Sequence, residues 1–406
     1  MRPAQPPVLA GFPGWLAFAP IGALLAACAE VPERPTPGYA IVGESGETWA
    51  PSEPDPDASG PLAPRLTVDG GGDGAVALDP GLPKVWTAPP GLPVPCDNQQ
   101  ISFDFDRFES SFTANHAFWM MWFAMRAFVS EEPSTRDELA ALGFGRFAHL
   151  DASAGLQAMV AASEDATLVS FRGSTEVEDY LNNAKFGLTD AADLGLVGQL
   201  HAGFNRALHE SWAALYELVG SLADRGQPVW LTGHSLGGTM ALVTAVKLDL
   251  AGFRVAGVYS FGGPRPGNRT FTQYVLGRLG TRSVRVVNHL DLAPRIPPAS
   301  IAAEHAAQVL DFDPLEGWAA EVVEKLDYAH ASGLYAFDED SNLVYRGTPG
   351  DWEDTLFWSE RAEHVSGVVG LVRDDRTHKE RHHPGTYLCK LQALRAGMLV
   401  GTDPNP

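Results

Sequence analysis

The stretch that decides the fold is VWLTGHSLGG at residues 229–238. It begins as a short apolar run typical of a buried strand, and an apolar helical pattern follows from Gly238 to Leu250. Between them lies a Gly-x-Ser-x-Gly pattern centred on Ser235. In a nucleophile elbow the serine occupies a strained turn between strand and helix, so its neighbours two residues away must be small. Gly233 and Gly237 meet this need, and Ser235 is therefore predicted to be a nucleophile.

Chance is the alternative explanation of this pattern, because glycine makes up 42 of the 406 residues. The strand before the serine and the helix after it make that alternative the minor one.

Outside this stretch, short apolar strands alternate with amphipathic helices. Strands are expected at 166–171, 229–232, 255–261 and 283–288, and helices at 205–223, 238–250 and 268–279. The apolar block within 112–129 is interrupted by Asn115, His116 and Arg126, which favours a buried helix over a membrane span. The alternation predicts the α/β class, with a mostly parallel central sheet and helices on both faces, as in α/β-hydrolases.

Three segments are expected along the chain. Residues 1–28 read as a signal peptide, with a positive start at Arg2 and an apolar core at 16–27. Fourteen of the 31 prolines lie within 29–96, so this segment is predicted to be a flexible linker, or in part an arm that packs on the domain. Residues 97–406 are predicted to be the catalytic domain.

The end of the signal segment, Leu-Ala-Ala-Cys at 25–28, resembles the lipobox of bacterial lipoproteins. That resemblance implies lipidation of Cys28 and attachment to a membrane. The alternative is an ordinary secretory signal. Either version predicts that the mature protein is exported.

The net charge of −21 argues against nucleic acid as a partner, because phosphate binding needs clustered lysine and arginine. A lipid or a soluble ester remains possible as substrate. The chain has only three cysteines and no Cys-x-x-Cys pair, so a structural zinc site is not expected. No metal or organic cofactor is predicted, and the sequence leaves the oligomeric state open.

A serine hydroxyl needs a base, and the base needs a carboxylate to orient it. In this fold the chain order is serine, acid, histidine. Asp291 stands three residues beyond the strand expected at 283–288, where the carboxyl ends of strands place active sites. Its rivals, which follow no comparable strand, are Asp311, Asp313 and Asp327. Spacing alone does not choose among the downstream histidines, which are His305, His330, His364, His378, His382 and His383.

From about residue 112 to residue 391 the chain resembles the class 3, fungal-type lipases. The resemblance rests on several motifs in the family's order. They are FRGST at 171–175, LHAGF at 200–204, GHSLGG at 233–238, FGGPRPGN at 261–268 and NHLDLAPRIPP at 288–298.

This resemblance implies that Asp291 is the catalytic acid and His382 the base, because Tyr387 follows His382 at the family's spacing. His383 is the alternative. Arg381 stands where the family usually has aspartate, which is a departure from the pattern. His330 resembles a second histidine of the family that is not the base.

Two donors are expected for the oxyanion of the tetrahedral intermediate. The backbone N–H of Leu236, the residue after the nucleophile, supplies one. The resemblance implies that Ser174 supplies the other. The segment after it contains Thr175, Val177, Tyr180 and Leu181, and in the family this segment is a lid that opens at a lipid surface. The alternative is an ordinary packed helix.

Cys96 and Cys389 lie at the two ends of the predicted catalytic domain. The family often joins these ends, and a disulfide suits an exported protein. If they are not joined, they are a buried or free pair.

The function expected from these features is hydrolysis of lipid esters, as by an acylglycerol lipase, through an acyl-enzyme. The alternatives are a phospholipase, a feruloyl-type esterase of carbohydrate-linked acids, or a surface module without catalysis.

Overall fold

The structure is a computed structural model of the chain. It describes residues 103–152, 155–173, 187–224, 226–297, 327–347 and 381–397, together with the short strands at 40–42, 48–49, 76–77 and 100–101.

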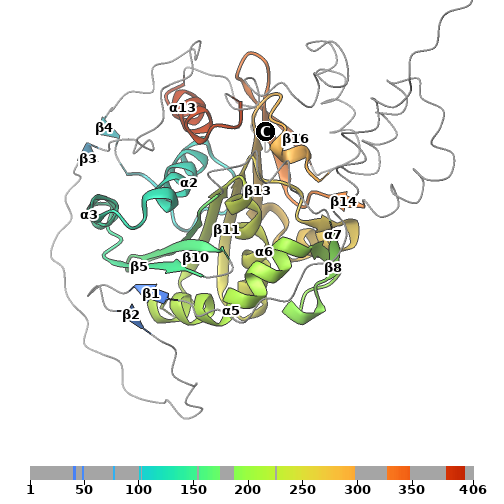
Figure 1. Cartoon of the computed structure of the whole chain (residues 1–406). Coiled ribbons are helices and arrows are strands. Elements are labelled where there is room, and N and C mark those ends of the chain that lie inside the picture. The colour runs from blue at the N-terminus through green and yellow to red at the C-terminus, as the bar shows by residue number, and fades with distance from the viewer. Residues whose placement is uncertain are drawn as a thin grey trace, which may run out of the picture.

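A ten-stranded sheet runs through the described part of the chain, in the order β16-β15-β13-β11-β10-β7-β6-β5-β1-β2. Its centre is parallel and consists of β7 (Thr167–Phe171), β10 (Pro228–His234), β11 (Arg254–Phe261), β13 (Ser283–Val287) and β15 (Gly333–Phe337). Helices cover both faces of this sheet (Figure 1). The predicted α/β-hydrolase architecture is confirmed.

The edges of the sheet are antiparallel. On one side β6 (Gln157–Ala162) and β5 (Arg146–Asp151) follow β7, and on the other β16 (Leu343–Gly347) pairs with β15. Beyond β5 the sheet continues with β1 (Ala40–Val42) and β2 (Thr48–Trp49). These last two strands come from the segment for which a linker was predicted.

Each face of the sheet has its own group of helices. The helices α5 (Ala202–Leu222), α6 (Leu236–Leu250) and α7 (Arg269–Leu279) pack on one face. The helices α2 (Ala114–Arg126) and α13 (Pro384–Arg395) pack on the other, where Figure 1 shows them close together.

Strand β10 illustrates why a buried parallel strand is apolar throughout. Val229 and Leu231 belong to the core under α5 and α6, whereas Trp230 points into the core under α2 and α13. Successive side chains of a strand point to opposite faces, and helices bury both faces here.

Helix α2 is a buried core helix, as predicted. The Thr113 hydroxyl caps its first turn by accepting the His116 N–H. At the other end the Arg126 guanidinium is buried, 2.7 Å from the Glu138 carboxylate and 4.4 Å above the Trp122 ring. Among the described residues, no helix combines the length and the apolar character needed to cross a membrane.

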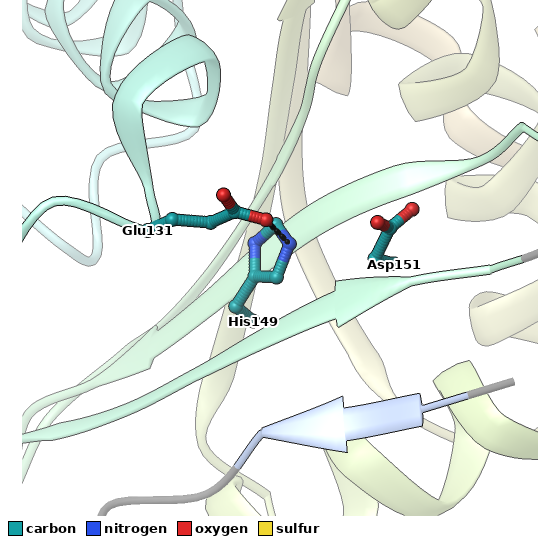
Figure 2. Close-up of side chains that lie close together, drawn as sticks. All are labelled: Glu131, His149 and Asp151. Atoms are coloured by element: carbon teal, nitrogen blue, oxygen red, sulfur yellow. Dashed lines mark ion pairs between the residues drawn. The ribbon is translucent and has the colours of Figure 1, made fainter. Parts of the chain in front are cut away.

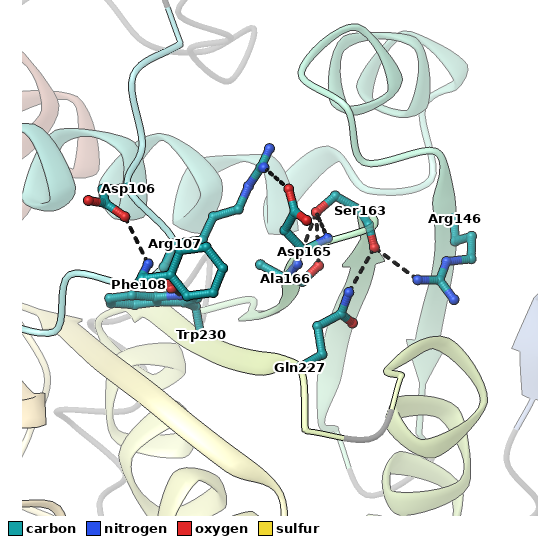
Figure 3. A network of polar contacts seen from close by, with 9 residues as sticks. All are labelled: Asp106, Arg107, Phe108, Arg146, Ser163, Asp165, Ala166, Gln227 and Trp230. Atoms are coloured by element: carbon teal, nitrogen blue, oxygen red, sulfur yellow. Dashed lines mark hydrogen bonds and ion pairs between the residues drawn. The ribbon is translucent and has the colours of Figure 1, made fainter. Parts of the chain in front are cut away.

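A polar network closes the amino ends of β7 and β10, at the opposite end of β10 from Ser235 (Figure 3). The Arg107 guanidinium pairs with Asp165 at 2.5 Å, and the Trp230 indole N–H donates to the Arg107 carbonyl. The Gln227 amide donates to the Ser163 carbonyl at 3.0 Å. These bonds connect the segment before α2 to the turns that begin the central strands.

The remaining elements are short. A four-stranded sheet has the order β14-β12-β9-β8, and β3 pairs with β4. Their bounds, with those of α3 and the 3₁₀ helices, are β3 Val76–Ala77, β4 Gln100–Ile101, η1 Ala127–Val129, α3 Pro133–Ala141, β8 Leu188–Asp190, η2 Ala192–Leu194, β9 Gln199–His201, β12 Gly267–Asn268, η3 Gly280–Arg282, η4 Ala293–Arg295 and β14 Tyr328–Ala329.

Candidate active site

Ser235 lies at the turn between β10 and α6 and has φ of 57°, in the left-handed region. Its N–H donates to the Phe261 carbonyl at 2.8 Å. A Cβ at Gly233 would lie 2.3 Å from the carbonyl of Gly237, and one at Gly237 would lie 2.3 Å from the carbonyl oxygen of Phe171. Both glycines are therefore required for the backbone to double back at the serine.

Asp291 follows β13 and is completely buried. One carboxylate oxygen accepts the Ala293 N–H at 3.0 Å, and the other accepts the Tyr387 hydroxyl at 2.6 Å. The His382 Nδ1 lies 3.0 and 2.9 Å from the two oxygens. These partners offset the cost of burying a carboxylate.

The two adjacent histidines have different surroundings. His382 is buried, and its Nδ1 faces Asp291, which leaves Nε2 as the basic nitrogen of a neutral ring. His383 is the N-cap of α13, and its Nδ1 accepts the Gly385 N–H at 3.1 Å. Burial, with the nearby charge of His382, lowers the pKa of His383 to about 4. The structure thus brings His382, and not His383, to the predicted acid.

His234 contacts the other side of His382. The two rings are 4.6 Å apart between centroids, and the His234 Nε2 lies 2.8 Å from the His382 carbonyl oxygen. Burial lowers the pKa of His234 well below its ordinary value. A neutral His234 donates from Nε2 to that carbonyl and so helps to position His382. In the sequence His234 was noted only as part of the elbow motif.

Helix α13 also holds the end of β13. The Tyr387 hydroxyl accepts the Asn288 N–H at 3.0 Å while it donates to Asp291. The Lys390 ammonium donates to the Asn288 side-chain oxygen at 2.6 Å, and the Asn288 amide donates to the Arg381 carbonyl. Sequence spacing identified Tyr387 as part of a pattern but did not identify these contacts.

Gly262, directly after β11, leaves room for this group. Its φ is +60°, and a Cβ there would lie 3.0 Å from Asp291 Oδ2, 3.0 Å from the Tyr387 hydroxyl and 3.2 Å from His382 Cε1. A side chain at this position would therefore push against both the acid and the histidine.

A cavity of about 150 Å³ lies beside the elbow. Its apolar lining consists of Leu156, Phe171, Phe204, Ala207, Leu236 and Met240. Leu236 is the first residue of α6, where a backbone N–H has no acceptor within its own helix. An N–H at this position can donate to an oxyanion formed next to Ser235.

The segment that carries the second expected donor begins close to the nucleophile. A Cβ at Gly173 would lie 3.4 Å from the Ser235 Cβ and 2.6 Å from the His234 carbonyl oxygen. The next residue, Ser174, lies outside the described residues. So do the other predicted positions of this region and of the N-terminal segment, which are Thr175, Val177, Tyr180, Leu181, Cys28 and Cys96.

The described rivals of the acid and the base have other contacts. Asp327 is half-buried and lies 3.7 Å from the Arg269 guanidinium. The His330 Nε2 bonds to the Pro294 carbonyl oxygen at 2.6 Å, and burial lowers the pKa of His330 well below its ordinary value. The remaining rivals lie outside the described residues; they are Asp311, Asp313, His305, His364 and His378.

The predicted disulfide concerns Cys389 of α13, which is buried and disulfide-bonded. Both other cysteines lie outside the described residues, so its pairing with Cys96 stays a prediction. One group of described side chains has the composition of a metal site, namely Glu131, His149 and Asp151 on and near β5. It is separated from β10 by β6 and β7.

Comparison with known proteins finds a family model that matches part of this chain. Residues 168–301 match the model of the family described as lipase (class 3). Secreted mono- and diacylglycerol lipase 1 of Fusarium solani is 36% identical over 154 residues, which cover 37% of this chain and 45% of that protein. A lipase of Rhizomucor miehei is 31% identical over 163 residues, which cover 37% of this chain and 43% of that protein.

A chloroplastic phospholipase A(1) of Arabidopsis thaliana is 27% identical over 184 residues, covering 40% of this chain and 41% of that protein. The chain thus spans less than half the length of these curated relatives. Among solved structures, the lipase of Rhizopus microsporus var. chinensis has a TM-score of 0.43 at 21% identity, covering 61% of this chain and 85% of that one.

Proposed function

We propose that this chain, which carries a class 3 lipase segment over residues 168–301, is a serine ester hydrolase that acts on lipid esters. The observation that carries the proposal is the contact of the His382 Nδ1 with Asp291 at 2.9 Å, next to the strained elbow of Ser235. Nucleophile, acid and base follow one another in the chain order of the α/β-hydrolases.

In the proposed first half-reaction, the His382 Nε2 takes the proton of the Ser235 hydroxyl as its oxygen attacks the ester carbonyl carbon. Asp291 orients the imidazole and stabilises the imidazolium that forms. The Leu236 N–H and Ser174 donate to the oxyanion. When the intermediate collapses, His382 returns the proton to the leaving alcohol and an acyl-enzyme remains.

In the second half-reaction, water attacks the acyl-enzyme with His382 again as the base, and the carboxylic acid leaves Ser235. The proposed steps use only side chains and backbone groups of this chain.

Acylglycerols are the proposed substrates. The apolar cavity beside Leu236 supports this choice, because it offers an acyl chain a place to leave water next to the nucleophile. The names of the Fusarium and Rhizomucor relatives support it as well. The similarity to a phospholipase A(1) makes a phospholipid the second candidate.

Export is also proposed, with Cys28 as a lipidation site. A signal-like core at 16–27 and the secreted relative from Fusarium support export. The lipobox-like residues 25–28 support the lipid anchor.

The test is hydrolysis of p-nitrophenyl esters of graded chain length, followed for the full chain and for Ser235→Ala. We expect activity that rises with acyl length in the wild type and falls by at least about a thousandfold in the variant. Equal rates in the two proteins would refute the proposal. Hydrolysis of phosphatidylcholine in preference to a diacylglycerol would favour the phospholipase.

A further inference from the structure

A second group of reactive side chains lies on and beside β5, three strands away from β10 in the order of the sheet (Figure 2). His149 and Asp151 are two residues apart on β5 and so lie on the same face of the strand. Glu131 follows η1 and approaches from the loop between η1 and α3. One ligand atom from each of the three residues lies within 4.8 Å of the other two.

The other ring nitrogen of His149 has a neighbour of its own. The Ser130 hydroxyl oxygen lies 2.7 Å from the His149 Nδ1 and 3.3 Å from the Ala127 carbonyl oxygen. In the tautomer that carries its proton on Nδ1, the ring donates to the Ser130 oxygen and has a lone pair on Nε2. A hydrogen bond of this kind from the ring nitrogen that does not bind the metal, here Nδ1, fixes the orientation of metal-binding histidines.

That Nε2 points at carboxylates. The His149 ring is buried, with only 6% of the residue exposed. Within the described residues its Nε2 has no hydrogen-bond partner, and Oε1 of Glu131 lies 3.5 Å away. In that tautomer the lone pair faces the Glu131 carboxylate, and a cation between them would make this arrangement favourable.

We propose that Glu131, His149 and Asp151 bind a divalent metal ion of the Zn²⁺ type. One imidazole and two carboxylates suit zinc and similar ions, and their two negative charges balance a divalent ion. Tetrahedral zinc with bonds of about 2.0 Å places its ligands about 3.3 Å apart, close to the present spacing of His149 and Glu131. The Glu131 side chain is 72% exposed, so small rotations can close the site, and water takes the fourth position.

Such an ion would connect the loop after η1 to strand β5. Because the unfolded chain does not hold these three groups together, ion binding would stabilise the folded state.

The test uses the full chain, stripped with EDTA, dialysed and titrated with Zn²⁺ by calorimetry, beside Glu131→Gln and Asp151→Asn. Both altered side chains are exposed and isosteric, so the variants are expected to fold. Loss of either ligand is expected to weaken the zinc site by at least about tenfold. The rise in Tm that zinc produces in the wild type should be lost in both variants.

His209→Gln is the matched control. His209 lies 3.6 Å from Asp193, but this exposed pair has only one carboxylate. The control should bind zinc as the wild type does. The proposal is overturned if the wild type shows no saturable zinc binding, if Glu131→Gln and Asp151→Asn keep the wild-type affinity, or if His209→Gln loses as much as they do.

Discussion

His382 and His383 are neighbours in the chain, yet they have different tasks in the fold. The side chain of His382 turns inward to Asp291, whereas His383 caps the first turn of α13. The difference arises where the chain enters α13, because the cap residue adopts a non-helical backbone conformation and its side chain faces the exposed amide groups of the first turn.

The two histidine variants should therefore separate catalysis from stability. His382→Ala is expected to lower kcat by at least about a thousandfold, because the base is lost. His383→Ala is expected to keep activity of the wild-type order and to lose about 1 kcal/mol of stability, as for other N-caps. Ester hydrolysis and urea unfolding of both variants measure this. Full activity in His382→Ala with loss in His383→Ala would reverse the assignment.

At the scale of elements, α13 is the helix that positions the site. Tyr387 and Lys390 are three residues apart and so lie on one side of the helix. The tyrosine holds Asp291, and the lysine holds Asn288 at the end of β13. A shift of this helix would move the base and the acid together.

Lys390 also makes the stability of this contact dependent on pH. Burial and the positive charge of Arg381 lower the pKa of Lys390 to about 7, while the charge of Asp338 opposes them. The unfolded chain has the ordinary pKa of 10.5 and binds more protons between these two values. The contribution of Lys390 to stability therefore becomes more favourable as the pH rises from about 7 toward 10.

Urea unfolding at pH 7, 8 and 9 measures this effect as the difference in unfolding free energy between the wild type and Lys390→Met. The unfolding free energy of the wild type should rise relative to that of Lys390→Met with each increase in pH. The same comparison for Lys247→Met is the control, because Lys247 is less deeply buried and its pKa is lowered less. A Lys390 difference that stays constant across the three pH values would contradict the prediction.

At the scale of the whole molecule, covalent bonding secures α13 as well. Cys389 is disulfide-bonded, and the sequence predicts Cys96 as its partner. A bond between these positions would join the start of the predicted catalytic domain to α13, the helix that directly follows the base.

Cys96→Ser should remove this bond and lower stability by about 2–5 kcal/mol. Intact-mass measurement before and after reduction tests the pairing, because the wild type gains two hydrogens and Cys96→Ser gains none. Cys28→Ser is the control and should still gain two hydrogens. Loss of the mass shift in Cys28→Ser, with the shift retained in Cys96→Ser, would show that the predicted pairing is wrong.

The sequence by itself determined the elbow and four of the five parallel strands at the centre of the sheet, whereas β15 was not predicted. The strands expected at 229–232 and 255–261 lie within β10 and β11, because strands buried on both faces are apolar throughout. The need for glycines around Ser235 could be predicted from the sequence, because the backbone doubles back within a few residues of the serine. The place of Asp291 after a strand was a local signal too.

Only the tertiary structure decided which side chains meet. His382 lies 91 residues beyond Asp291. Spacing along the chain does not show which of the two adjacent histidines, His382 or His383, lies near the acid. The antiparallel strands β5 and β6 were not predicted, although their inner residues are buried. The contacts of Asn288 with Lys390 and of Glu131 with His149 likewise depend on how helices and loops pack on the sheet. Sequence spacing predicts which residues are neighbours within one helix or strand. The contacts between catalytic residues depend instead on how different elements pack together.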